Sequence, residues 1–244
     1  MAGCGKSASV NYRMIVEVED GDVVRRGSSV WRFKITENIP LGGRSFKPEF
    51  WGEAITVDIP GKGALFVLPQ GRSVEGNLRG NNPEMLPEHK FGKDVERDTG
   101  GNYSGDRRLK WLTTISSRYV GRAKTLECPE FFESYASGRK DRLTSDCLFM
   151  VRFRDIKKPA TVEAVDPANL AASFGKGVKL KRILIQITDD DVTTGIEKKL
   201  PSLLGYLEKR SMFSGRGFSA RRDPKTEHLL ADQLGPGEFS TALR

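Results

Sequence analysis

Alternation between apolar and polar residues is the feature that most limits the fold of this chain. Every second side chain is apolar in YRMIVEVE (12–19) and in SSVWRFKITE (28–37), and most side chains between them are polar. Successive side chains of a strand point to opposite faces, so each segment predicts a strand with one apolar face. EAITVDI (53–59) continues the pattern, and ALFVL (64–68) is a short, wholly apolar run that also predicts a strand. Residues 12–69 are therefore predicted to form an antiparallel meander of four strands.

The second half of the chain adds further strands and short helices. CLFMVRF (147–153) and VKLKRILIQI (178–187) predict two strands. Three helix starts are predicted: Asp166-Pro167, a capping box over Thr194–Glu197, and Pro129 within CPEFFESYA. The first of these helices should end at Gly175. The predicted class is α+β, dominated by antiparallel β-sheet with a few short helices.

Residues 70–110 differ from the rest of the chain. They are polar, rich in Gly and Asn, and almost without periodicity. We predict a long polar loop insertion that is either mobile or folds against a partner. The following segment, WLTTISSRYV (111–120), is predicted to be a strand or a short helix. The predicted organisation is a tether at 1–11 and a single domain at 12–244 that carries this insertion.

The opening MAGCGKS fits two incompatible patterns. A phosphate-binding loop needs a first Gly five positions before Gly5, and a strand before it, and the sequence supplies neither. Ala2-Gly3-Cys4 instead matches the end of a bacterial lipoprotein signal, in which small residues precede a cysteine that receives lipid. We expect the basic and apolar parts of such a signal upstream of Met1. The alternative is an ordinary exposed thiol at Cys4.

The three cysteines and the positive net charge bear on the compartment and the surroundings in which the protein is found. If Cys4 carries lipid, Cys128 and Cys147 remain as a pair that could bridge in an oxidising compartment, stabilising the fold by about 3 kcal/mol. The alternative is two buried free thiols. The net charge of +8 favours anionic surroundings, but the basic residues are dispersed and accompany no nucleic-acid motif.

Three phrases, taken in order, resemble a family of Gram-negative lipoproteins of unknown function: GEAITVDIPGKGALFVL, VDPANLAASFGKGVKLKRILIQITDDDVTTGIEKKLPSLLGYL and GPGEFST. The resemblance implies lipid attachment at Cys4 and a domain that faces the periplasm, and it implies no reaction. Gly5, rather than Asp, follows the cysteine, which favours the outer membrane over the inner one. Up to three acyl chains on one cysteine would make a stable anchor.

Few residues suggest chemistry. His89 and His228 have no local partners at a recognisable spacing, and Asp189–Asp191 is more typical of a solvated turn than of a calcium loop. The sequence predicts no cofactor, metal or catalytic residue. Trp51 is the tryptophan expected to be exposed, and it forms a candidate binding surface together with Arg107 and Arg108.

The leading hypothesis is a lipid-anchored, non-enzymatic envelope protein whose domain binds another envelope protein or a glycan. The first alternative is an envelope hydrolase with its site in residues 70–110. The second alternative is a cytosolic basic protein that binds nucleic acid.

Overall fold

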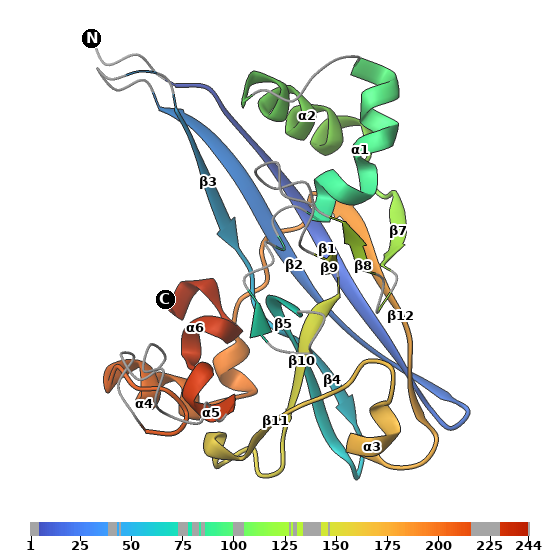
Figure 1. Cartoon of the computed structure of the whole chain (residues 1–244), viewed down its shortest axis with the longest axis vertical. Helices are drawn as coiled ribbons and strands as arrows, with labels where there is room; N and C mark the ends of the chain where they lie inside the picture. Colours follow the sequence, from blue (N-terminus) through green and yellow to red (C-terminus); the bar gives the residue numbers. More distant parts are fainter. Residues whose placement is uncertain are drawn as a thin grey trace.

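The computed structural model describes residues 5–38, 43, 45–72, 78–79, 83, 86–99, 105–126, 128, 131–133, 143–145, 147–215 and 230–243. Within them the chain forms two antiparallel β-sheets and several short helices (Figure 1). The predicted α+β class is confirmed. No helix in the described part of the chain is both long enough and apolar enough to cross a membrane.

The larger sheet has the strand order β3-β2-β1-β12-β7. Its strands are β1 (Ser7–Asp20), β2 (Val23–Asn38), β3 (Ser45–Trp51), β7 (Ala123–Leu126) and β12 (Val178–Thr188). All neighbouring strands are antiparallel. The central strand β1 therefore pairs with β2, which follows it directly, and with β12, which comes near the end of the chain.

The smaller sheet has the order β11-β10-β5-β4, with β6 paired to β5. Its strands are β4 (Ile55–Ile59), β5 (Gly63–Arg72), β6 (Leu78–Arg79), β10 (Leu148–Phe153) and β11 (Val162–Ala164). A separate two-stranded pair joins β8 (Phe131–Glu133) to β9 (Leu143–Ser145).

The predicted single meander is wrong, because the chain changes sheet after β3. β1, β2 and β3 belong to the larger sheet, whereas β4 and β5 belong to the smaller one. The change occurs at Gly52, where a Cβ would lie 2.6 Å from Cδ1 of the buried Trp31. Only glycine allows the backbone to pass so close to that ring. β3 is a strand in addition to the four that were predicted for residues 12–69.

Residues 70–110 are not a structureless insertion, and that expectation is corrected. They contain helix α1 (Leu86–Thr99) and the beginning of helix α2 (Gly105–Arg118). Each helix buries a narrow apolar stripe, with Phe91 and Val95 one turn apart on α1. On α2, Leu109, Trp111, Leu112 and Ile115 are buried in the same core. Because each helix has few apolar residues among many charged ones, its helical period is hard to see in the sequence.

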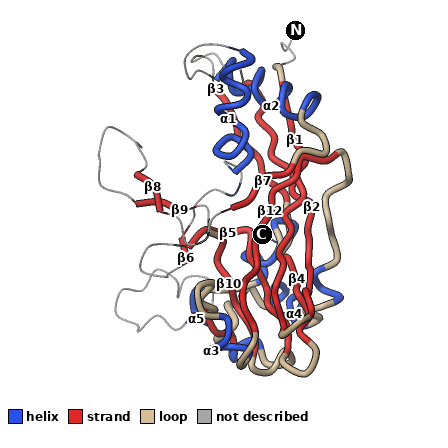
Figure 2. The backbone as a smooth tube through the Cα atoms, turned by 90° about the vertical axis from the view of Figure 1, so that its right-hand side faces the viewer, coloured by secondary structure: helices blue, strands red, loops and turns tan. Residues whose placement is uncertain are grey.

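The core has two layers, one on each face of the smaller sheet. The first lies between the larger sheet, the smaller sheet and helices α1 and α2, and includes Tyr12, Trp31 and Phe33. The second lies between the smaller sheet and the C-terminal helices, and includes Phe66, Phe149, Phe153, Phe213 and Phe239. Figure 2 shows α1 and α2 at the opposite end of the molecule from α3 (Leu170–Phe174) and α5 (Leu230–Gln233).

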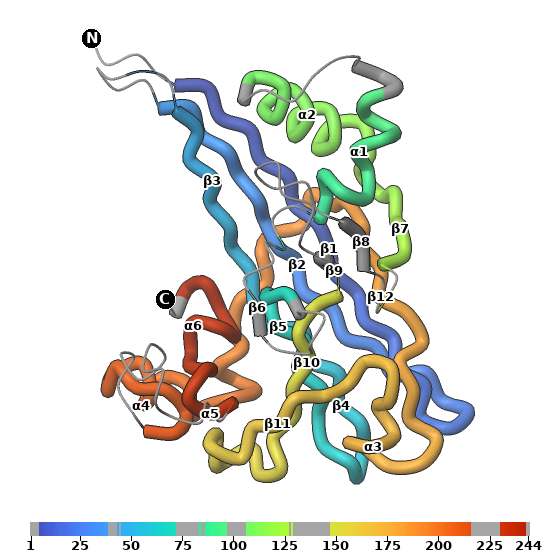
Figure 3. The backbone as a smooth tube through the Cα atoms, viewed as in Figure 1, coloured from blue at the N-terminus to red at the C-terminus, as the bar shows by residue number. Residues whose placement is uncertain are grey.

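The C-terminal helices are α4 (Ser202–Glu208), α5 (Leu230–Gln233) and α6 (Pro236–Phe239), with 3₁₀ turns at Ile196–Lys198 and Thr241–Leu243. The chain reaches them by crossing the outer face of the larger sheet after β12 (Figure 3). Asn11 on β1 donates a side-chain hydrogen bond to the carbonyl of Asp190, and Thr193 exchanges hydrogen bonds with the backbone of Val30 on β2. This crossing segment covers Val30, which is buried.

Helix α3 (Leu170–Phe174) ends at Gly175 as predicted, with a φ of 90° at that glycine. Its N-cap is Asn169, however, and Asp166 forms a turn three residues earlier. A 3₁₀ turn at Pro159–Thr161 precedes β11.

Two other predicted helix starts fail. The turn at Ile196–Lys198 has no side-chain cap from its N-cap residue, so the capping box over Thr194–Glu197 is wrong. The described part of CPEFFESYA contains a strand, Phe131–Glu133, rather than a helix.

Candidate functional site

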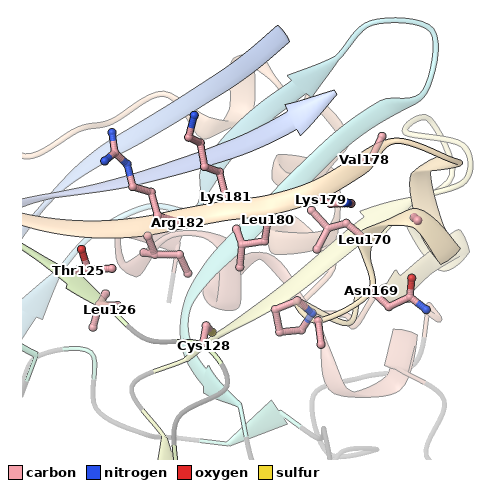
Figure 4. A pocket seen from close by; sticks show the side chains of 14 residues that line it. Thr125, Leu126, Cys128, Asn169, Leu170, Val178, Lys179, Leu180, Lys181 and Arg182 are labelled. Carbon is pink, nitrogen blue, oxygen red and sulfur yellow. The ribbon is translucent and has the colours of Figure 1, made fainter. Parts of the chain in front are cut away.

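A groove of about 430 Å³ runs along one side of β12. Its wall is the first part of β12, from Val178 to Ile183, and its other sides come from β7, from Cys128 and from the start of α3 (Leu170–Phe174). Figure 4 shows the side chains of Leu126, Leu170 and Leu180 on the groove side of β12. The volume is in the range of small-molecule and peptide sites.

The groove exists because β7 is much shorter than β12. β1 pairs with β12 from Val178 to Thr188, whereas β7 pairs only with Ile183–Gln186. Among the described residues, Val178–Arg182 therefore face no strand on that side. Such an edge presents backbone N–H and C=O groups that another strand can pair with.

A disulfide bond lies just after the end of β7. Cys128 lies two residues after β7 and is bonded to Cys147, which directly precedes β10 of the smaller sheet, with Cα atoms 5.1 Å apart. The bond therefore ties the two sheets together beside the groove. Cys147 is buried and Cys128 packs against the main core and lines the groove. The pairing is the one considered from the sequence, and it replaces the alternative of two free thiols in this structure.

The two faces of the free edge differ in chemistry. Leu180 opposes Val18, on the core side of the sheet, and lines the groove. Lys179 opposes Glu19 and Arg182 opposes Glu17 on the outer side. Lys181 is the extra residue of a β-bulge, because the register shifts by one between Glu17 and Val18. In Figure 4 the side chains of Lys181 and Arg182 point away from the groove.

Two of these three cations, Lys181 and Arg182, form ion pairs with carboxylates on β1. Glu17 accepts a hydrogen bond from Nε of Arg182 at 2.7 Å, and Nε of Arg26 lies 4.0 Å from it. The hydrogen bond from Arg182 lowers the pKa of Glu17, although burial opposes the shift. Glu19 lies 3.7 Å from Nζ of Lys181. Lys179 has no ion pair within the described ranges.

The residues predicted as a binding surface do not come together. Trp51 is exposed as expected, with 37% of its surface accessible, while Trp31 and Trp111 are buried. Trp51 opposes Arg32 at the end of β3, on the outer face of the larger sheet. Arg108 lies over the ring of Phe33, on the inner face. The sheet thus separates Trp51 from the two arginines.

The two arginines have structural roles in the helical pair. Arg108 donates two hydrogen bonds to the buried carboxylate of Glu88, at 2.9 and 3.1 Å, and so joins α2 to α1. Arg107 lies 3.6 Å from Glu96. The cavity that they line with Trp111 measures about 10 Å³, which is the size of a single water site.

The remaining candidates are scattered. Cys4 and His228 lie outside the described residues, and His89 is exposed on α1. Asp190 sits in an exposed turn, where hydrogen bonds from Thr188 and Arg13 lower its pKa. Within the described ranges no group of three or more His, Cys, Asp or Glu side chains could hold a metal ion.

Sequence reasoning missed one buried carboxylate. Glu53 accepts hydrogen bonds from the backbone N–H of Ile196 at 2.9 Å and from the hydroxyl of Ser240 at 3.0 Å. Its backbone carbonyl accepts the indole N–H of Trp31 at 2.8 Å. These contacts hold the two sheets and the C-terminal segment together. The only signal in the sequence was a charged residue next to an otherwise apolar strand.

Comparison with known proteins adds no assignment. No family model matches the chain, and no curated protein or solved structure matches it. The site must therefore be interpreted from its own geometry: a strand edge, a groove beside it that three leucine side chains line in part, and three cations on the outer face of the strand.

Proposed function

We propose that this protein is a lipid-anchored binding protein of the bacterial cell envelope, attached to the membrane through Cys4 and carrying out no chemistry of its own. The observation that supports this proposal best is the disulfide between Cys128 and Cys147 beside the groove on β12. Structural disulfides persist in oxidising compartments such as the periplasm and are rare in the cytosol.

The form of the groove favours binding over catalysis. Its wall is the backbone edge of β12, and its lining combines the side chains of Leu126, Leu170 and Leu180 with polar residues that include Thr125 and Asn169, while Lys181 and Arg182 point away from it. Such a surface offers shape, apolar area and hydrogen-bonding backbone, which are the means by which one protein holds another. The lipid on Cys4 would keep this surface at the membrane.

Metabolic labelling tests the proposal. The native gene with its upstream sequence is expressed in a Gram-negative host that is fed an alkyne analogue of palmitate. We expect label on the wild-type protein and none on Cys4→Ser, with both proteins at similar abundance. Wild-type protein without label would overturn the lipid anchor.

Thiol chemistry tests the compartment separately. Cells are treated with an alkylating reagent during lysis, before and after reduction. We expect Cys128 and Cys147 to be alkylated only after reduction. Alkylation of both without reduction would contradict an oxidising location.

A further inference from the structure

We propose that the free edge of β12 binds an extended peptide segment of alternating acidic and apolar residues, which pairs with Val178–Arg182 as an additional strand of the larger sheet. This inference rests on the proposed binding function and identifies the chemistry of the partner. The partner segment would continue the line of β7 beyond Leu126, next to the residues of β12 that β7 does not reach.

The edge provides the backbone half of the recognition. β12 is held rigidly along its other side, because β1 pairs with it over its whole length. Its free side, Val178–Arg182, is preorganised as a strand before any partner arrives, which lowers the entropic cost of binding. Addition of a strand to an exposed edge is a common way to bind extended peptides.

The two faces of the edge determine the alternating pattern. Side chains of an added strand that point inward would enter the groove beside Leu126, Leu170 and Leu180, where apolar groups fit. Those that point outward would lie next to Lys179, Lys181 and Arg182, where carboxylates fit. A strand with both properties must alternate acidic and apolar residues.

The charges also exclude a second copy of this edge as the partner. Two such edges would place lysines against lysines, which is a known protection against self-association. An acidic segment instead gains from Lys179, which has no ion pair among the described residues. The net charge of +8 would also speed its approach.

Binding of synthetic peptides to the purified, oxidised protein tests the inference. The probe is a fluorescent peptide of about six residues that alternates glutamate and valine, a usual length for a strand. One control peptide alternates lysine and valine, and another contains the same glutamates and valines in two separate blocks. We expect saturable binding of the alternating acidic peptide, and binding at least about tenfold weaker for both controls.

Two charge reversals locate the site. Lys179→Glu should weaken binding of the acidic peptide at least about fivefold. Lys47→Glu makes the same change in net charge on β3, at the opposite edge of the same sheet, where the side chain is 64% exposed. It should leave the affinity within about twofold of the wild type. Both lysines are exposed, so both variants should fold, which circular dichroism checks.

Amide hydrogen exchange tests the strand pairing directly. In the free protein the edge-facing amides of Lys179–Arg182 should exchange quickly, and the peptide should slow them. Three outcomes would overturn the inference: these amides are already protected, the block peptide binds as well as the alternating one, or Lys179→Glu binds as tightly as Lys47→Glu. If the peptide does not bind but Cys4 carries lipid, this inference fails and the proposed location is unaffected. If the peptide binds but Cys4 carries no lipid, the inference holds and the lipid anchor fails.

Discussion

Glu53 accepts a hydrogen bond from the backbone N–H of Ile196 at 2.9 Å, although 143 positions separate the two residues in the chain. The same carboxylate accepts the hydroxyl of Ser240, so one side chain holds the start of the C-terminal segment and its end. Because Glu53 is only 5% exposed, these bonds form where water cannot replace them.

Glu53→Ala should therefore lower the free energy of unfolding by about 2–4 kcal/mol, because it leaves buried donors without an acceptor. Glu53→Gln keeps one acceptor oxygen and the same shape, and should cost less than the alanine. Urea unfolding followed by fluorescence measures both. Glu49→Ala, on β3, is the control and should be nearly neutral; a neutral Glu53→Ala would contradict the bridging role.

Removal of the disulfide should destabilise the protein without unfolding it. Cys128→Ser combined with Cys147→Ser should cost about 2–4 kcal/mol, because the loop of 19 positions is no longer closed in the unfolded chain. The melting temperature of the wild type should fall on reduction, whereas that of the double variant should not change. Equal melting temperatures for oxidised and reduced wild type would show that the bond contributes nothing.

Stability should depend on pH through Glu17. The hydrogen bond from Arg182 lowers the pKa of Glu17 from 4.5 in the folded state, so the ionised carboxylate is more favoured in the folded state than in the unfolded state. The stability that the pair contributes is fully present above about pH 4.5 and is lost as the pH falls through the lower folded pKa.

The difference in unfolding free energy between wild type and Glu17→Gln should accordingly be constant from pH 7 to about 5 and shrink below pH 4.5. Urea unfolding at several pH values measures this difference. Glu49→Gln serves as the matched control for the loss of one negative charge. A difference that grows on acidification would have the wrong sign for a lowered pKa.

Two glycines should respond in opposite directions to alanine. A Cβ on Gly27 would lie 2.1 Å from the backbone carbonyl of Thr56, where β2 of the larger sheet meets β4 of the smaller one. Gly27→Ala should cost at least about 2 kcal/mol, because two backbones would have to separate. Gly205 lies within α4 with open space around it, so Gly205→Ala should stabilise the protein by about 0.5–1 kcal/mol. The melting temperatures of the two variants and the wild type, measured by thermal unfolding, test both expectations.

The long strands β1, β2 and β12 were predictable and the helices of residues 70–110 were not, for a physical reason. In β1 and β12 nearly every core-facing position is apolar, so the period of two is visible in the sequence. In α1 the buried stripe depends on Leu86, Phe91 and Val95 among charged neighbours. That helix owes its stability to packing on the sheet, which no local pattern records.

The groove could not be predicted from local sequence at all. It depends on where β7 stops, on a bond between Cys128 and Cys147, and on a bulge at Lys181. The sequence suggested the cysteine pair, but it gave no sign that part of β12 would be left open. The predicted surface around Trp51 failed for a related reason, since the face of a residue follows from its register in the sheet.

The central position of β1 has a consequence for biogenesis. Glu17 pairs with Arg182 across the sheet, so β1 cannot complete its pairing until β12, which lies 165 positions later at this pair, has been synthesised. Contacts this distant in sequence form slowly. In a newly made chain this side of β1 would therefore remain unpaired for most of its synthesis, so the larger sheet would be incomplete during that time, which is the condition that the proposed export to the envelope would require.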